Sequence, residues 1–182
     1  MRDKGLVVKC VKCKKWYLVS EGCSRCKQDS VNARGEIRFI SDDETAPLIK
    51  EMLGGAMDSV LIASPWMWGI SDIVQRLEWL RKEKVDISIL TRRSGETDAE
   101  HEKTVDAIRR FGCLIDFIDE LHAKIVLVDE RELYIGSANL VGTSLERNKE
   151  AGIWTNDPAT VSDARSYLAD AFAEAFKKRS KK

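Results

Sequence analysis

The sequence predicts an α/β domain with helices on both faces of a β-sheet, preceded by a small N-terminal metal-binding knuckle. Short β-rich runs alternate with segments of helical periodicity from about residue 36 to residue 178, the pattern of a layered α/β domain. Ahead of them, four cysteines form two CxxC pairs. We therefore expect a knuckle with its linker over residues 1–34 and the main domain over residues 35–182.

The cysteine spacing predicts a structural zinc site. Cys10 and Cys13 form one pair, Cys23 and Cys26 the other, and nine residues separate the pairs. Each CxxC turn directs two thiolates at one point, and two such turns complete the tetrahedral sulfur site that suits zinc. A pair of disulfides is the alternative, which a chain without a visible secretion signal disfavours. Because four thiolates complete the coordination, we expect no catalytic metal here.

The main domain opens with alternating strands and helices. We expect a strand at 37–40, a helix from about Thr45 with Pro47 in its first turn, and a buried strand at 60–63. A helix beginning at Ser71, a strand at 85–90 and a helix from the Thr97-Asp-Ala-Glu100 capping box to about Gly112 follow. The three predicted helices and the strands between them make up the first half of the layered domain.

The second half contains further strands and a closing helix. The expected strands span 114–118, 124–128, 133–135 and 151–155. Asp157-Pro158 places an N-cap before a proline in the first helical position. This last helix should bury the apolar side chains at helical spacing, which are Val161, Ala164, Leu168, Ala171, Phe172 and Ala175. Cys113, beside Leu114, is expected to be buried.

Composition and charge exclude some classes of protein. The chain is 43% hydrophobic and 33% charged, which is typical of a folded globular protein. No apolar run approaches the ~20 residues of a membrane-spanning helix, so we expect a cytoplasmic protein. The formal net charge is zero, but residues 1–34 hold nine Lys and Arg against three Asp and Glu, and residues 35–176 hold 16 against 27. One interpretation is that a polyanion would bind first to the basic ends of the chain. The alternative is that the basic ends only make the chain soluble.

The segment with the strongest chemical signal is His122-Ala-Lys124, followed by Ile-Val-Leu-Val-Asp129. Two residues apart on a strand, His122 and Lys124 project from the same face. A few residues later comes Gly136-Ser137-Ala-Asn139, where the glycine permits a close backbone approach. An imidazole, an ammonium, a hydroxyl and a carboxamide at one sheet edge suit a phosphate. The alternative is a buried strand whose polar groups satisfy one another.

The pattern HxKxxxxD followed by GSxN resembles the catalytic motif of the phospholipase D superfamily, over about residues 36–178. This resemblance implies a phospholipase D-like mixed sheet and phosphodiester cleavage without a catalytic metal. It implies that His122 forms a phosphohistidine, that Lys124 and Asn139 bind phosphate and that Ser137 supports them. Asn148-Lys-Glu150 resembles the segment that places a carboxylate behind the histidine, so Glu150 is expected to bond the far imidazole nitrogen. For Asp129 we expect a supporting role behind the direct contacts.

The motif occurs once, which predicts a homodimer. In-line displacement requires a nucleophile on one side of phosphorus and a general acid on the other. The second histidine, His101, lies in an acidic helical turn without the motif and is expected to be exposed to solvent. A twofold dimer would place two copies of His122 face to face. The resemblance implies the same, because short single-motif members of the superfamily act as dimers and many are nucleases.

Two aromatic and basic segments remain open. Trp66 and Trp68 follow a strand and either stack on bases or, as we favour, pack in the core or a dimer interface. The pair Arg92-Arg93 either contacts phosphate or forms an exposed turn. Basic and aromatic residues around the first CxxC pair suit nucleic-acid binding through phosphate contacts and base stacking. They are Lys9, Lys12, Lys14, Lys15, Trp16 and Tyr17.

The sequence as a whole thus predicts a homodimeric endonuclease that acts on nucleic acid, with DNA favoured over RNA. The alternatives are a lipid phosphodiesterase, for which no amphipathic membrane anchor is evident, and a catalytically silent nucleic-acid-binding module. The complete set of motif residues argues against the silent module, because a decayed site usually loses its nucleophile.

Overall fold

The computed structural model describes residues 7–9, 16–18, 35–93 and 98–179. Strands β1 (Val7–Lys9) and β2 (Trp16–Leu18) pair in antiparallel fashion. Cys10, Cys13, Cys23 and Cys26 lie outside the described residues, so the zinc site stays a prediction.

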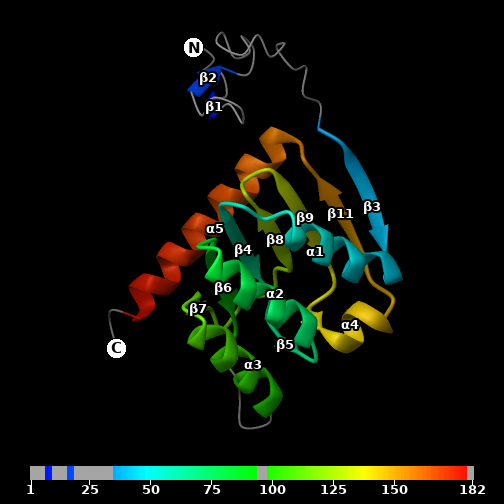
Figure 1. Cartoon of the computed structure of the whole chain (residues 1–182), viewed down its shortest axis with the longest axis vertical. Helices are drawn as coiled ribbons and strands as arrows, with labels where there is room; N and C mark the ends of the chain where they lie inside the picture. Colours follow the sequence, from blue (N-terminus) through cyan, green and yellow to red (C-terminus); the bar gives the residue numbers. More distant parts are fainter. Residues whose placement is uncertain (1–6, 10–15, 19–34, 94–97, 180–182) are drawn as a thin grey trace.

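Seven strands form one mixed sheet in the order β3-β11-β9-β8-β4-β6-β7 (Figure 1). Their bounds are β3 Ile37–Ser41, β4 Ser59–Ala63, β6 Asp86–Thr91, β7 Leu114–Phe117, β8 Ile125–Val128, β9 Glu132–Gly136 and β11 Ala151–Thr155. β4, β6 and β7 run parallel to one another, whereas each remaining neighbour pair is antiparallel. The mixed α/β architecture expected from the alternating patterns is thereby confirmed.

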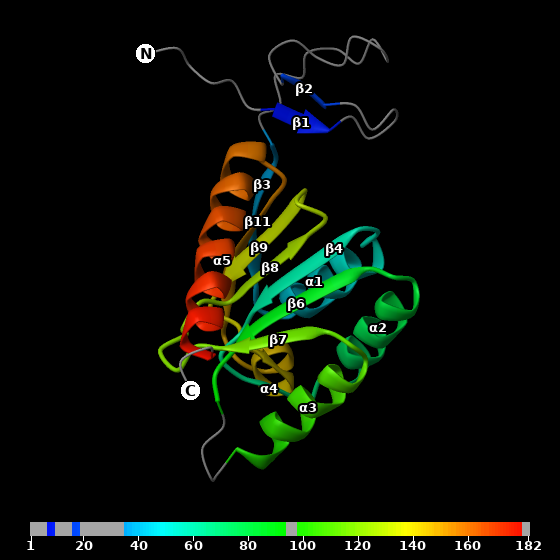
Figure 2. The same ribbon diagram turned by 90° about the vertical axis from the view of Figure 1, so that its left-hand side faces the viewer.

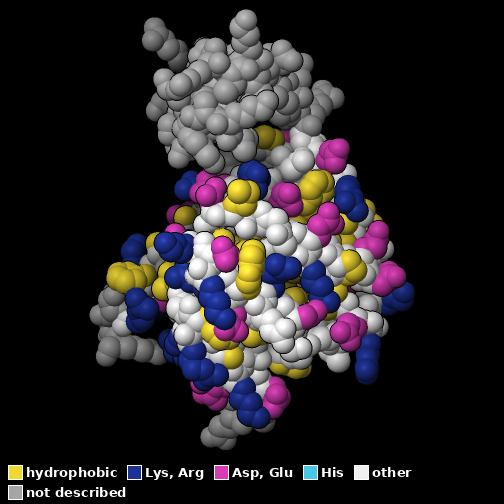
Figure 3. Space-filling model, viewed as in Figure 1, with side chains coloured by type: hydrophobic (Ala, Val, Ile, Leu, Met, Phe, Trp, Pro, Cys, Tyr) yellow, Lys and Arg dark blue, Asp and Glu magenta, His cyan; other side chains and the backbone are white. Residues whose placement is uncertain are grey.

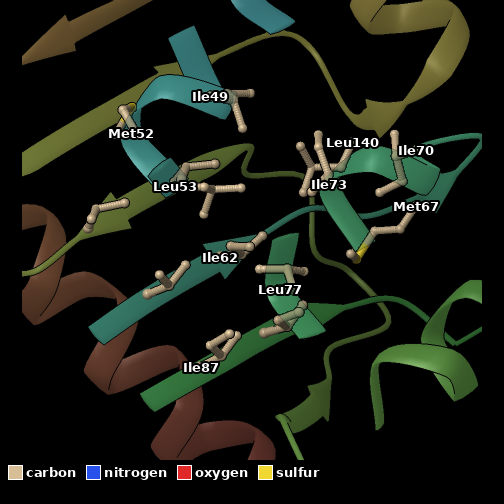
Figure 4. Close-up of a cluster of buried hydrophobic side chains, with 14 of the residues drawn as sticks. Ile49, Met52, Leu53, Ile62, Met67, Ile70, Ile73, Leu77, Ile87 and Leu140 are labelled. Carbon is tan, nitrogen blue, oxygen red and sulfur yellow. The ribbon is translucent and has the colours of Figure 1, made fainter. Parts of the chain in front are cut away.

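Helices cover both faces of this sheet (Figure 2). On one face lie α1 Thr45–Gly54, α2 Ser71–Lys82, α3 Ala99–Arg110 and α4 Gly142–Glu146, and the other face carries α5 Pro158–Arg179. Figure 4 shows the first core, where Ile49 and Leu53 of α1 and Leu77 of α2 pack toward Ile62 of β4. The second core joins Leu168 of α5 to side chains of β8 and β9. Each face of the sheet therefore has its own apolar core.

The helix boundaries follow from local capping. Ser41 and Glu44 form a capping box ahead of α1, in which the Ser41 backbone N–H donates to Glu44 Oε2 at 3.1 Å. Asp157 caps α5 as expected, since its Oδ2 accepts the Thr160 N–H at 2.9 Å. The capping box expected ahead of α3 begins at Thr97. Residues 94–97 lie outside the described residues, so this capping box stays a prediction. Cys113 is buried as expected, and burial raises the pKa of its thiol to about 11.

Several short elements were not expected from the sequence, among them β5 Met67–Trp68, β10 Leu140–Val141, α4 and the 3₁₀ turn Asp42–Glu44 ahead of α1. β5 and β10 pair in parallel, Leu140 with Met67 and Val141 with Trp68. Two-residue strands are too short to show an alternating pattern, and their partners lie far apart in the chain, so only the tertiary fold brings them together.

One edge of the sheet gathers the ends of five strands. The carboxyl ends of β4, β6 and β7 lie there with the amino end of β8, because Ala63 pairs with Ile125. The carboxyl end of β9 joins them, because Ile135 pairs with Ile125. We call this the site edge, since ligands of open α/β sheets bind beyond the carboxyl ends of strands. In the part of the chain that the structure describes, no helix is long and apolar enough to cross a membrane.

Candidate active site

His122 and Lys124 lie on the site edge immediately before β8. The strand begins at Ile125, one residue later than expected, and its four residues are all buried. Lys124 is 8% exposed, whereas His122 is exposed to solvent. The Lys124 ammonium Nζ lies 3.2 Å from both ring nitrogens of His122 and donates to the His122 carbonyl oxygen at 2.7 Å. The expected juxtaposition of imidazole and ammonium is present.

The Lys124 ammonium lies in a partly desolvated position. Burial lowers the pKa of Lys124, because the charged form loses solvation, and the nearby Glu150 carboxylate opposes this shift. A cation held beside an exposed imidazole with little competing water attracts an anion strongly. The position therefore suits a phosphate oxygen.

The GSxN segment follows β9 at the same edge. The Gly136 N–H donates to the Lys124 carbonyl oxygen at 3.1 Å, which joins the two halves of the motif. A Cβ atom at Gly136 would collide with the Tyr134 hydroxyl and lie 2.9 Å from the Ala151 carbonyl oxygen. Glycine is needed here because the backbones approach closely, as the sequence predicted. The Ser137 N–H in turn donates to the Ala151 carbonyl oxygen at 2.9 Å.

Glu150 is paired with Ser137 and not with the imidazole. The Ser137 hydroxyl donates to Glu150 Oε2, and Asn148 Nδ2 lies 3.5 Å from Glu150 Oε1. The Glu150 N–H donates to Asp42 Oδ1 at 3.1 Å, which anchors this segment to the 3₁₀ turn Asp42–Glu44 ahead of α1. Among the hydrogen bonds of the described residues, none joins Glu150 to His122, so the expected bond is absent from this arrangement. Ser137 directly follows β9, and Glu150 directly precedes β11. Because these two strands pair, the Ser137 hydroxyl lies within hydrogen-bonding distance of the Glu150 carboxylate.

Asn139 lies beyond Ser137 and has a buried amide oxygen without a hydrogen-bond partner. The backbone on either side is held, because the Val141 N–H donates to the Asn139 carbonyl oxygen at 2.8 Å and the Leu140 N–H donates to Ser64 Oγ at 2.9 Å. The amide oxygen is an acceptor, so the Nδ2 group of Asn139 is the part of this side chain that can donate to a phosphate oxygen.

A cavity of about 270 Å³ opens in front of the motif. His122, Lys124, Gly136 and Ser137 line it, and Ile135 and Tyr167 supply an apolar wall. Asn139 and Glu150 are not part of this lining. The sequence analysis missed Tyr167, because a tyrosine on the exposed side of a long helix carries no signal for a site.

Asp129 lies at the opposite end of β8, away from the cavity. Its carboxylate accepts backbone N–H bonds from Met57, Asp58 and Ser59, with the shortest at 2.7 Å, and pairs with Arg131 at 2.7 Å. The expectation that Asp129 supports the site is therefore wrong. It lies at the tight turn between β8 and β9, where its φ is 52°.

The other histidine also departs from expectation. His101 is 1% exposed, so the prediction that it faces solvent is wrong. Its Nδ1 accepts the Met67 N–H at 3.0 Å, and its Nε2 lies 3.0 Å from the Arg92 carbonyl oxygen. The acidic turn around it suggested exposure, but one face of α3 packs on β5. Over the described ranges, no group of three or more His, Cys, Asp or Glu side chains could hold a metal ion.

Comparison with known proteins places this geometry in a family. The domain described as "Cardiolipin synthase, PLD-like domain" matches residues 49–172, more than half of the chain. DISARM protein DrmC of Bacillus paralicheniformis is 27% identical over 123 residues, covering 60% of this chain and 48% of that protein. The chain thus spans about half the length of this relative.

Solved structures share the fold at low sequence identity. Nuc of Salmonella typhimurium, a phospholipase D family member, has a TM-score of 0.69 at 18% identity over 77% of this chain and 95% of its own. NucT of Helicobacter pylori has a TM-score of 0.67 at 18% identity over 78% and 98%. The archaeal chromatin protein TrmBL2 has a TM-score of 0.58 at 17% identity over 76% and 52%. With its fold and the match of more than half its length, the chain belongs to the PLD-like domain family of the phospholipase D superfamily.

Proposed function

We propose that this protein is a metal-independent endonuclease, with DNA favoured over RNA, that uses His122 as its nucleophile. The observation that carries the proposal is the exposed His122 imidazole with the Lys124 ammonium 3.2 Å from its ring nitrogens, both on the wall of one cavity. A nucleophile next to a fixed cation is suited to attack an anionic phosphodiester, because the cation offsets the charge that repels attack.

The reaction proceeds in two displacements. A ring nitrogen of His122 attacks phosphorus, an N–P bond forms, and the P–O bond to the leaving oxygen breaks. The leaving oxygen takes a proton from an imidazolium on its other side. Water then attacks the phosphohistidine and gives its proton to that second imidazole while the N–P bond breaks. Lys124 and Asn139 bind the non-bridging oxygens, and Ser137, held by Glu150, supports them.

The second imidazole comes from a second copy of the chain. Three exposed apolar side chains lie side by side on the α5 face, because Phe39 pairs with Ile153 and Ile153 with Ile135. Phe39 is 67% exposed, and Ile135 also lines the cavity with His122. A twofold partner that covers this row would therefore stand next to the nucleophile.

Three features support nucleic acid as the substrate. The first 34 residues and the last six are basic, so they would hold a polyanion near the domain. TrmBL2, which shares the fold, is described as a chromatin protein with a novel mode of DNA binding. In the part of the chain that the structure describes, the helices pack their buried apolar side chains against the sheet, which leaves lipid phosphodiesterase chemistry less well supported.

A substrate panel tests this proposal. The protein should cleave single-stranded DNA, duplex DNA or RNA in EDTA, and leave phosphatidylcholine vesicles intact. EDTA should not inhibit, because Lys124 and Asn139 supply the charge and hydrogen bonds that a metal would otherwise supply. Release of choline without nucleic-acid cleavage would instead establish the lipid reaction. A strict need for added Mg²⁺ would contradict the mechanism.

The N-terminal cysteines should bind about one zinc ion per chain, because four thiolates form a closed tetrahedral site. Protein purified without chelator should contain zinc by elemental analysis, and replacement of Cys23 and Cys26 by serine should remove it. The main domain should remain folded after this change, because its two cores lie within residues 40–175. Equal zinc content in the parent and the double variant would contradict the assignment.

A further inference from the structure

We propose that Trp66 and Arg92 form a platform that binds an unpaired stretch of the nucleic-acid strand beside the cavity of His122. This inference rests on the proposed nuclease function and adds to it the preferred form of the substrate. Trp66 and Arg92 are hereafter called the platform.

The platform lies on the site edge. Trp66 follows β4 and Arg92 follows β6, which are neighbouring parallel strands whose carboxyl ends meet there. The Arg92 guanidinium lies over the Trp66 ring at 5.4 Å from its centroid, and both side chains are partly exposed. An indole and a guanidinium are the two flat groups on which nucleobases stack.

Buried hydrogen bonds hold the platform backbone in place. His101 joins the two segments, because its Nδ1 accepts the Met67 N–H and its Nε2 bonds the Arg92 carbonyl oxygen, each at 3.0 Å. Its ring also meets the Trp66 ring edge to face, with centroids 5.3 Å apart. The Thr91 hydroxyl adds a bond to the Pro65 carbonyl oxygen at 3.1 Å. Because these bonds satisfy the backbone, the aromatic and guanidinium groups are presented in a fixed geometry.

The same segment connects the platform to the motif. Ser64 Oγ donates to the Trp66 carbonyl oxygen at 2.8 Å and accepts the Leu140 N–H at 2.9 Å. Leu140 directly follows Asn139 and pairs with Met67 across β5 and β10. A nucleic-acid strand with a phosphate bound at Asn139 would therefore pass close to Trp66.

Among the described residues, Arg92 differs from the basic residues around it in that no ion pair joins it to a carboxylate. Arg93 pairs with Asp119 at 3.8 Å, and Arg109 pairs with Asp106 at 2.7 Å. The guanidinium groups of these two arginines also lie over the Phe117 ring. Within the described ranges, no carboxylate forms an ion pair with Arg92. Its charge is available for a phosphate, whereas the charges of its neighbours are largely offset.

The charge of the domain favours an unpaired strand over a duplex. Residues 35–176 contain 16 Lys and Arg against 27 Asp and Glu. On the face seen in Figure 3, basic and acidic side chains are interspersed and no broad basic surface is present. A duplex hides its base faces and is held mainly through its phosphates, which a domain with an excess of acidic residues would bind weakly. An unpaired strand can also stack its bases on the platform, which adds to its binding.

The test measures binding of the full chain carrying His122→Ala, so that the oligonucleotide stays intact. Fluorescence anisotropy gives Kd for a labelled single-stranded 12-mer and for its duplex. Trp66→Leu should weaken single-strand binding by about 10-fold, and Trp66→Phe, which keeps a ring, by less than about 3-fold. Arg92→Gln should weaken it by about 5-fold and lower the slope of log K against log salt by about 0.7. Duplex binding should be weaker in the parent and unchanged by Trp66→Leu.

The chain offers a matched control. Arg76 lies over Trp79 on α2 at 5.2 Å, and Trp79 is 46% exposed, so this is a second stack of the same kind away from the site edge. Arg76→Gln and Trp79→Leu should leave both Kd values within twofold. Arg92→Gln guards against misfolding as the explanation, because the Arg92 side chain is partly exposed and forms no ion pair with a described residue.

The platform would be overturned by single-strand Kd values within twofold of the parent for Trp66→Leu and Arg92→Gln, or by equal losses in the control pair. Failure of the underlying nuclease proposal looks different. It would appear as hydrolysis of bis(p-nitrophenyl) phosphate that survives His122→Ala, whatever the platform variants do. A parent that binds the duplex more tightly than the single strand would also refute the platform.

Discussion

Replacement of His122 by alanine is expected to abolish phosphodiester cleavage, with a loss of at least about 10⁴-fold in kcat. In the proposed dimer the loss is large, because the variant removes the nucleophile from one subunit and the general acid from the other. His122 is exposed and contributes no apolar burial, so the thermal unfolding midpoint should stay within about 2 °C of the parent. Initial rates on an oligonucleotide in EDTA, together with a thermal melt, measure both effects.

Mixtures of chains show whether two copies of His122 share one site. If they do, co-refolding parent with an equal amount of His122→Ala chains should leave about one quarter of the parental activity, because only parent homodimers work. Independent sites would leave about one half. The pH profile of the parent should be bell-shaped, because one imidazole must be neutral while the other is protonated.

The exposed lysine next to Glu150 supplies a control for the charge. Lys149 is 91% exposed and pairs with Asp42, whereas Lys124 is buried beside the imidazole. Lys124→Ala should reduce kcat by at least about 100-fold, because the loss of one group that stabilises transition-state charge has an effect of this size. Lys149→Ala should change kcat by less than about 2-fold. Equal effects would contradict a specific role for Lys124.

Replacement of Asp129 by alanine is expected to lower the free energy of unfolding by about 3 kcal/mol. The Asp129 side chain is 1% exposed, and its removal leaves the backbone N–H groups of Met57, Asp58 and Ser59 without their acceptor. Alanine also tolerates a φ of 52° poorly. Urea unfolding at pH 7 measures the loss. Asp129→Asn should cost less, because asparagine adopts this φ and keeps one acceptor oxygen.

The stabilisation by Asp129 should depend on pH. Burial alone would raise the pKa of Asp129, but the three backbone N–H bonds and Arg131 outweigh it, so the pKa is lowered. The folded state therefore keeps the carboxylate ionised at a pH where the unfolded chain binds a proton. This stability is present above the ordinary aspartate pKa of about 3.9 and disappears as the pH falls through the lowered folded value.

Unfolding at pH 7 and at pH 3 checks this dependence. The difference in stability between parent and Asp129→Ala should shrink at the lower pH. Asp170→Ala, which removes an exposed carboxylate from α5, should change stability by less than about 0.5 kcal/mol at either pH. A constant difference for Asp129→Ala would show that its carboxylate does not hold the turn through its charge.

The sequence by itself determined the parts of this protein that depend on local pattern. Apolar runs, caps and turns predicted the seven strands of the main sheet and the helix after Asp157, because periodicity and capping act over a few residues. It also predicted that His122, Lys124 and Ser137 would meet at one edge, since each lies next to the end of a short strand.

Only the tertiary structure decided which groups face one another. His101 is buried because α3 packs on β5, and Glu150 bonds Ser137 because β11 lies beside β9. Asp129 is itself a residue of the HxKxxxxD motif, yet β8 carries it to the opposite end of the sheet, where three backbone N–H groups stabilise its charge. Such partners come from segments far apart in the chain, so the burial and pairing that select them are set by packing and carry no local signal.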